Sequence, residues 1–137
     1  MAHEPFEKLV VWQRAIELVE AVYRLTREFP ADEKSGLAAT LRRAVTGIPA
    51  KIADAEGQDD PDKISQAYAS ARGTIRELQT YTVICRRMRF LGYMNYTSLR
   101  RRLRRIDRMI VAQGNAPEPT VSAEKPSARP PARRLAA

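Results

Sequence analysis

The chain has 137 residues, 44% of them hydrophobic, with a single cysteine and a formal net charge of +8. This length allows one domain whose core needs neither a metal nor a disulfide. There is no apolar run of the ~18 residues that a membrane span needs and no basic-then-apolar secretory signal, so we expect a cytoplasmic protein without a membrane partner.

The first predicted helix, residues 7–29, carries an unusually wide apolar arc made of two sets of residues. One set is Leu9, Trp12, Ile16, Val19 and Tyr23; the other is Val11, Ala15, Leu18, Val22, Leu25 and Phe29. An outer helix of a monomeric bundle needs only a narrower apolar stripe. We therefore expect a second buried contact, with another subunit, and assign the oligomer interface to Val11, Leu18, Val22 and Leu25.

The second predicted helix, residues 35–56, has a proline in its middle. Its apolar residues recur at helical spacing on both sides of Pro49, and Ser35 is a candidate N-cap. Proline lacks the N–H that the carbonyl of Val45 would accept, which costs roughly 3 kcal/mol in a helix interior. We expect tight packing of this helix against its neighbours to offset that cost.

Two further helices follow before the pattern stops. Asp60 and Pro61 form a capped helix start, Gly92 ends this third helix, and Asn95 is a candidate cap for the fourth. Short connections make neighbouring helices antiparallel, so residues 1–113 are predicted to form an all-α, antiparallel up-down-up-down four-helix bundle. Residues 114–137, rich in proline and arginine, are predicted to be a disordered basic tail.

Three segments of the chain together resemble one bacterial family. They are FEKLVVW at residues 6–12, RRAVTGIPAKIAD at residues 42–54 and ARGTIREL at residues 71–78. The family includes proteins encoded in intervening sequences of large-subunit ribosomal RNA genes, and the accessory variability protein of diversity-generating retroelements. This chain departs from its usual pattern at Lys51, Asp54 and Ala55, where the family has asparagine, glutamate and glycine.

The resemblance implies a four-helix bundle that assembles into a homo-oligomer, a pentameric ring, without known catalysis. Retroelement members of the family bind a reverse transcriptase and nucleic acid. The resemblance therefore implies RNA or DNA, and a reverse transcriptase, as candidate partners of this chain. It implies no cofactor.

The strongest functional signal in the residues themselves is an arginine-rich region in the second half of the chain. Residues 1–62 hold 8 Lys+Arg and 12 Asp+Glu, whereas residues 63–137 hold 16 and 4, net charges of −4 and +12. Arginine binds phosphate bidentately, and like charges four residues apart on a helix repel each other. The predicted nucleic-acid-binding residues are Arg86, Arg87, Arg100, Arg101, Arg104, Arg105 and Arg108.

Three functions stay open at this point. The first is binding of nucleic acid, RNA in particular, by the arginine-rich face. The second is a structural or protein-binding oligomer in which the arginines pair with Glu17, Glu20 and Asp32 of a neighbour. The third is an enzyme with a site between subunits, but His3 is the only histidine, and metal-ligand spacings and a phosphate loop are absent. We therefore expect no catalytic residues, metal or cofactor.

Overall fold

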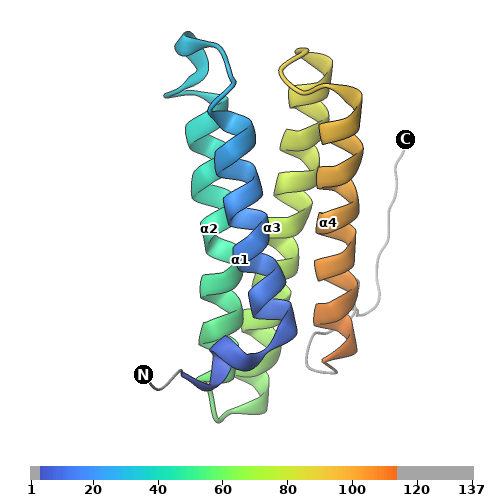
Figure 1. The fold of residues 1–137 in the computed structure, drawn as a ribbon. Coiled ribbons are helices and arrows are strands. Elements are labelled where there is room, and N and C mark those ends of the chain that lie inside the picture. Colours follow the sequence, from blue (N-terminus) through green and yellow to red (C-terminus); the bar gives the residue numbers. More distant parts are fainter. Residues whose placement is uncertain (1–3, 114–137) are drawn as a thin grey trace, which may run out of the picture.

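The computed structural model describes residues 4–113, and four long helices in this part run alternately up and down (Figure 1). Helix α1 spans Val10–Thr26, α2 spans Leu37–Glu56, α3 spans Pro61–Arg87 and α4 spans Tyr93–Ala112. Two 3-10 turns, η1 (Pro5–Lys8) and η2 (Ala31–Glu33), precede α1 and α2. The predicted all-α, up-down-up-down bundle is confirmed, and the predicted tail at residues 114–137 lies outside the described residues.

All four helices contribute to one apolar core. Leu18 of α1, Ile48 of α2, Ile75 of α3 and Leu103 of α4 are at most 1% exposed. Burying such a side chain contributes about 1.5–3 kcal/mol, so these positions fix the mutual packing of the helices. Most of the apolar residues that form the wide pattern in the sequence are thus buried within the bundle of a single chain.

The oligomer interface assigned from the sequence is wrong for three of its four residues. Val11, Leu18 and Val22 are 0%, 0% and 1% exposed, because they face the other helices of the same bundle. Leu25 is only partly buried and lines a small pocket between α1 and α4. The other apolar set stays half-buried or exposed throughout: Leu9, which caps α1, and Trp12, Ile16, Val19 and Tyr23 within it.

Helix α2 continues through Pro49 without interruption, as the sequence predicts. Pro49 is itself buried, so its ring is packed rather than exposed to water. The start of the helix differs from the prediction, because Gly36 and not Ser35 is the capping residue. The Glu33 carboxylate instead accepts a hydrogen bond of 3.1 Å from the backbone N–H of Leu37.

Helix α3 begins as predicted but ends earlier. Asp60 accepts a hydrogen bond from the backbone N–H of Asp62, with Pro61 in the first turn. At the other end Arg89 has a φ of 67°, in the left-handed region, and the N–H of Phe90 donates to the carbonyl of Cys85 over 2.8 Å. This arrangement is a Schellman motif, which stops the helix before Leu91 at a cost of roughly 1 kcal/mol for a residue other than glycine.

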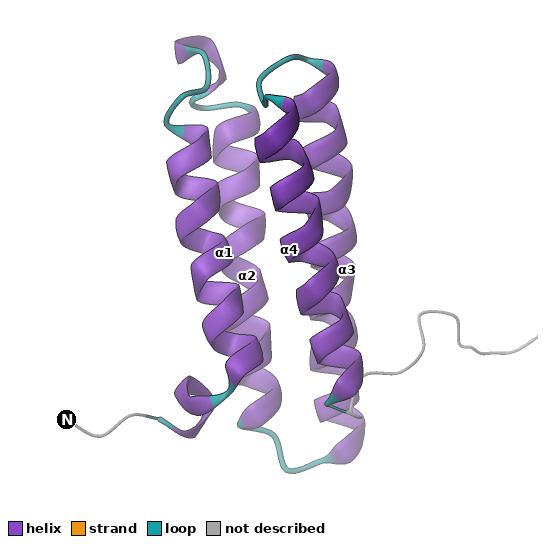
Figure 2. Cartoon of the chain, turned by 45° about the vertical axis from the view of Figure 1, so that its right-hand side comes forward, coloured by secondary structure: helices purple, strands orange, loops and turns teal. Residues whose placement is uncertain are grey.

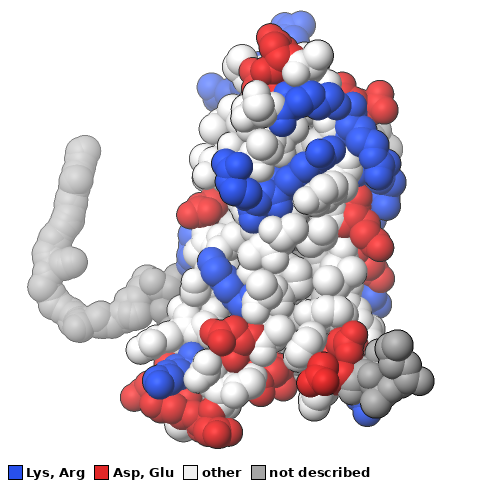
Figure 3. All heavy atoms as spheres, turned by 90° about the vertical axis from the view of Figure 1, so that its left-hand side faces the viewer, with Lys and Arg blue, Asp and Glu red and all other residues white. Residues whose placement is uncertain are grey.

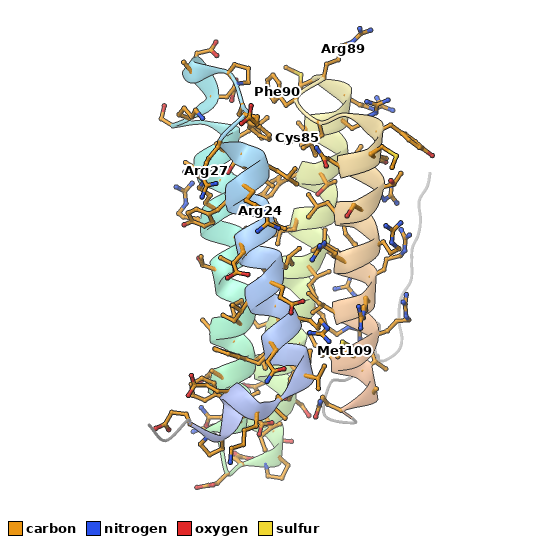
Figure 4. The ribbon with its side chains drawn as sticks, viewed as in Figure 1. Arg24, Arg27, Cys85, Arg89, Phe90 and Met109 are labelled. Carbon is orange, nitrogen blue, oxygen red and sulfur yellow. The ribbon has the colours of Figure 1, made fainter. Side chains whose placement is uncertain are left out.

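The two loops at this end of the bundle contact each other through aromatic rings. Phe90 of the α3–α4 connection packs against Phe29 after α1, with 5.5 Å between the ring centroids. Figure 4 shows Phe90 directed toward the α1–α2 end while Arg89 points away from the bundle. The predicted cap Asn95 lies within α4, which starts at Tyr93 after Gly92.

One ion pair connects α3 to α4. The guanidinium of Arg72 donates two hydrogen bonds to the carboxylate of Asp107, Nε to Oδ1 over 2.9 Å and Nη2 to Oδ2 over 3.3 Å. The two side chains are 9% and 31% exposed. A charge this well buried is stable only when it is paired, so the pair fixes the register of the two helices.

We expect Asp107→Ala to lower the free energy of unfolding by about 2 kcal/mol or more, because it leaves the buried Arg72 guanidinium without its carboxylate. Glu17→Ala is the matched control, since it breaks the Arg14–Glu17 pair of 3.0 Å, whose side chains are 33% and 49% exposed. The control should cost less than about 0.5 kcal/mol. Urea unfolding measures both variants. Equal losses of unfolding free energy would show that the Arg72–Asp107 pair stabilises the fold no more than an exposed ion pair does.

A buried tyrosine ties α3 to the end of α2. The Tyr68 ring is 0% exposed, and its hydroxyl donates a hydrogen bond of 3.1 Å to Oε2 of Glu56. Burial, then the hydrogen bond to Glu56 and its negative charge, raise the pKa of Tyr68 from 10.0 to about 12. The folded state therefore favours the protonated hydroxyl.

Because folding raises the pKa of Tyr68, its protonated hydroxyl contributes fully to the free energy of unfolding below pH 10. This contribution is lost as the pH rises toward about 12. We expect the free energy of unfolding to fall over this window by no more than roughly 3 kcal/mol. Urea titrations at several alkaline pH values measure it. Tyr68→Phe should be less stable at neutral pH, and its free energy of unfolding should depend less on pH over the same window. If the pH dependence of this variant equals that of the wild type, the assignment to Tyr68 is contradicted.

Candidate nucleic-acid interface

Helix α4 divides into a narrow apolar stripe and a broad basic surface. Leu99, Leu103, Ile106 and Ile110 are at most 3% exposed and face the core. Nearly all other positions from residue 100 to residue 108 are arginine, with Asp107 as the exception. We call the arginines of α4 the α4 arginines: Arg100, Arg101, Arg102, Arg104, Arg105 and Arg108.

Most α4 arginines have no partner in the part of the chain that the structure describes. Arg101, Arg104 and Arg108 are exposed, as are Arg102 and Arg105, and no hydrogen bond or ion pair within residues 4–113 involves their guanidinium groups. Repulsion between like charges four residues apart costs a few tenths of a kcal/mol per pair. The surface therefore carries concentrated positive charge that intramolecular contacts leave uncompensated.

Arg100 differs from the others because it is held in place. Its Nη1 donates to the hydroxyl of Tyr96 over 2.5 Å, and its guanidinium carbon lies 5.4 Å from the centre of the same ring. The contact combines a hydrogen bond with a cation–π interaction. Arg100 is half-buried, and its guanidinium is oriented by a residue one turn earlier on α4.

The predicted residues at the end of α3 form a separate basic tip. Arg86 is committed to the fold, since its Nη1 donates to the carbonyl of Leu91 over 3.1 Å and its guanidinium lies over the Tyr93 ring. Arg86 is nonetheless exposed, as are Arg87 and Arg89. The three arginines line an open hollow of about 620 Å³ together with Leu91 and Gly92.

Helix packing brings further arginines to the basic surface that the sequence analysis did not assign. Figure 2 shows α3 and α4 side by side. Between them lies an open groove of about 500 Å³, which we call the arginine groove; it is lined by Arg76, Gln79, Thr80, Val83, Arg100 and Arg104. On the other flank of α4, Arg24 of α1 and Arg102 line a smaller pocket of about 150 Å³. Placing Arg76 and Arg24 required knowing which helices are neighbours of α4.

The opposite side of the bundle has a different charge pattern. Figure 3 views the side on which α2 lies, where basic groups gather toward the α1–α2 loop and acidic groups toward the other end. Arg42 on this side is used structurally: its Nε donates to Thr26 Oγ1 over 2.8 Å, and its guanidinium lies 4.6 Å from the centre of the Tyr23 ring. Mixed charge of this kind is usual for a solvated surface, in contrast to α4.

The described residues offer little for other chemistry. No group of three or more His, Cys, Asp or Glu side chains among them could hold a metal ion. None of the described helices combines the length and apolarity needed to cross a bilayer. The thiol of Cys85 is 0% exposed, and burial, with a smaller effect from the charge of Glu33, raises its pKa to about 11. A thiol of this kind is unreactive.

The fold and surface define a class, an all-α bundle with a basic fourth helix, and comparison with known proteins gives the family. The model of the 23S rRNA-intervening sequence proteins matches residues 7–112. The chain belongs to the 23S rRNA-intervening sequence protein family. The predicted resemblance to proteins of ribosomal RNA intervening sequences is thereby confirmed.

A solved structure has the same fold. It is a protein of unknown function from the S23 ribosomal protein family of Bacteroides thetaiotaomicron, with a TM-score of 0.71 and 17% identity. The match covers 76% of this chain and 94% of the other. At this identity the likeness establishes the fold alone. No curated protein matches the chain.

Proposed function

We propose that this protein is a non-catalytic, oligomeric accessory protein that binds nucleic acid, RNA in particular, through the α4 arginines. The observation that carries the proposal is the run of exposed α4 arginines without intramolecular partners. Membership of a family named for ribosomal RNA intervening sequences agrees with an RNA-related role. No catalytic residue, metal or cofactor is required.

The energetics favour a polyanion as the ligand of this surface. A bound phosphate relieves the repulsion between neighbouring α4 arginines, and the planar guanidinium can donate two hydrogen bonds to one phosphate. Each neutralised phosphate also releases counterions, which makes binding strongly dependent on salt. These contacts reach the backbone of nucleic acid and carry no sequence information.

A second candidate is a protein-binding oligomer without intrinsic nucleic-acid affinity, such as a partner of a reverse transcriptase. Glu17, Glu20 and Asp32 are exposed and could pair with the α4 arginines of a neighbouring subunit. The family resemblance of the sequence supports this alternative through the retroelement members. The two candidates predict opposite effects of removing the arginine charges.

Changing Arg101, Arg104, Arg105 and Arg108 together to glutamine keeps helix propensity and the buried stripe of α4. If these residues hold phosphates, RNA affinity should fall, and the dependence of log K on log salt should flatten by about 0.7–0.9 per lost contact. The melting temperature should hold or rise, because intrahelical repulsion is removed. Fluorescence anisotropy with labelled RNA and thermal melting measure both quantities.

A matched control removes four exposed charges away from the basic surface, at Lys8, Arg27, Arg43 and Lys63. Figure 4 labels Arg27, which follows the last residue of α1. This variant should retain most of the RNA affinity. If the α4 variant instead melts earlier and binds RNA like the wild type, the arginines pair with acids of a neighbouring subunit and the second candidate is correct.

We also propose a homo-oligomer, with a pentameric ring as the expected form. The partly exposed apolar side chains of α1, including Trp12, Val19 and Tyr23, supply the contact surface in place of the buried set assigned from the sequence. Light scattering should give the mass of five chains. Val19→Lys should reduce the mass while leaving the helical content intact, because lysine can extend its ammonium to water in the separated subunit. A monomeric mass for the wild type would refute the proposal.

A further inference from the structure

The arginine groove combines features that a merely charged surface does not have. Arg76, Thr80 and Val83 recur at helical spacing on α3, and Arg100 and Arg104 do so on α4, so the two rows face each other across the seam. The groove thus places guanidinium groups from two different helices along one line. The amide of Gln79 and the hydroxyl of Thr80 add polar groups to its lining.

We infer that the arginine groove holds the sugar–phosphate backbone of one RNA strand, with Arg76, Arg100 and Arg104 contacting successive phosphates. This inference rests on the proposed function and identifies which part of the basic surface is the binding site. It adds Arg76, from α3, to the α4 arginines. The inference differs from non-specific attraction by net charge, because it assigns binding to one site.

The groove is partly preorganised for an anion. Arg100 is already oriented by Tyr96 through the 2.5 Å hydrogen bond and the ring contact, so little side-chain freedom is lost when it meets a phosphate. Arg76 and Arg104 are exposed and have no hydrogen bond or ion pair from their guanidinium groups within residues 4–113. One arginine is therefore fixed, and two remain available to adjust to the ligand.

The Arg72–Asp107 pair lies one helical turn beyond Arg76 and Arg104 along the same seam. Asp107 is the only acidic residue of α4, and its carboxylate is engaged at both oxygens by Arg72. Its negative charge is thereby neutralised where it would otherwise attract the groove arginines. No acidic side chain is among the residues that line the groove.

The arrangement of the guanidinium groups favours a single strand. Arg76, Arg100 and Arg104 lie along one seam between two helices, so they can follow one backbone, whereas the second backbone of a duplex would lie outside the seam. The residues that line the groove include no aromatic ring on which a base could stack. Binding should accordingly involve phosphates and be independent of sequence.

The test compares two double variants that remove the same charge from equivalent places. Arg76→Gln with Arg104→Gln alters both walls of the arginine groove, while Arg24→Gln with Arg102→Gln alters the two walls of the pocket on the other flank of α4. The probe is a fluorescein-labelled oligouridylate, measured by anisotropy over a range of salt concentrations. Circular dichroism confirms that both variants fold.

The groove variant should lose about tenfold or more in affinity, and its salt slope should fall by about 1.4, which corresponds to two lost single-strand contacts. The flank variant should lose less than about threefold. Equal losses in the two variants would overturn the groove as a site while leaving RNA binding by the basic surface intact. Failure of the wild type to bind the probe at all would instead refute the proposed function.

A duplex of the same length provides the second arm. It should bind more weakly than the single strand and should lose less affinity in the groove variant. A duplex that binds as tightly and depends equally on Arg76 and Arg104 would overturn the assignment of a single strand.

Discussion

The contact between Arg72 and Asp107 determines both how α3 meets α4 and what charge α4 presents. The guanidinium is almost fully buried, so it requires the carboxylate, and the two hydrogen bonds hold the helices in one register. The same contact neutralises the one acid in a helix otherwise rich in arginine. One pair of side chains therefore affects both the packing of α3 against α4 and the charge that α4 presents to solvent.

Helical periodicity made the architecture predictable, including the passage of α2 through Pro49 and the start of α3 at Asp60. Details that depend on a few local hydrogen bonds were not predictable. Glu33, and not Ser35, satisfies the N-terminus of α2, because a side chain four residues before Leu37 folds back onto it. The division of the α1 apolar arc into core and outer residues was also assigned the wrong way round, since that choice depends on where the neighbouring helices lie.

The basic surface was predictable only in part, for a similar reason. The α4 arginines lie close together in the sequence. Because the apolar stripe of the same helix faces the core, the arginines must face solvent. Arg76 lies on another helix, 24 residues before Arg100, and its place beside Arg100 and Arg104 depends on the antiparallel register of α3 and α4. The contacts of the Arg86 guanidinium with the Leu91 carbonyl and the Tyr93 ring were also not predictable, because they depend on the path of the α3–α4 connection.

The antiparallel order of four helices brings the first and last described residues to the same end of the bundle, as Figure 1 shows. The α1–α2 and α3–α4 connections, with Arg87 and Arg89, lie at the other end. A reporter, an affinity handle or a surface tether joined to residue 4 or residue 113 would consequently be held about the length of a 20-residue helix, roughly 30 Å, from that tip. Immobilised in this way, the bundle would stand upright and present its arginine tip to the solution.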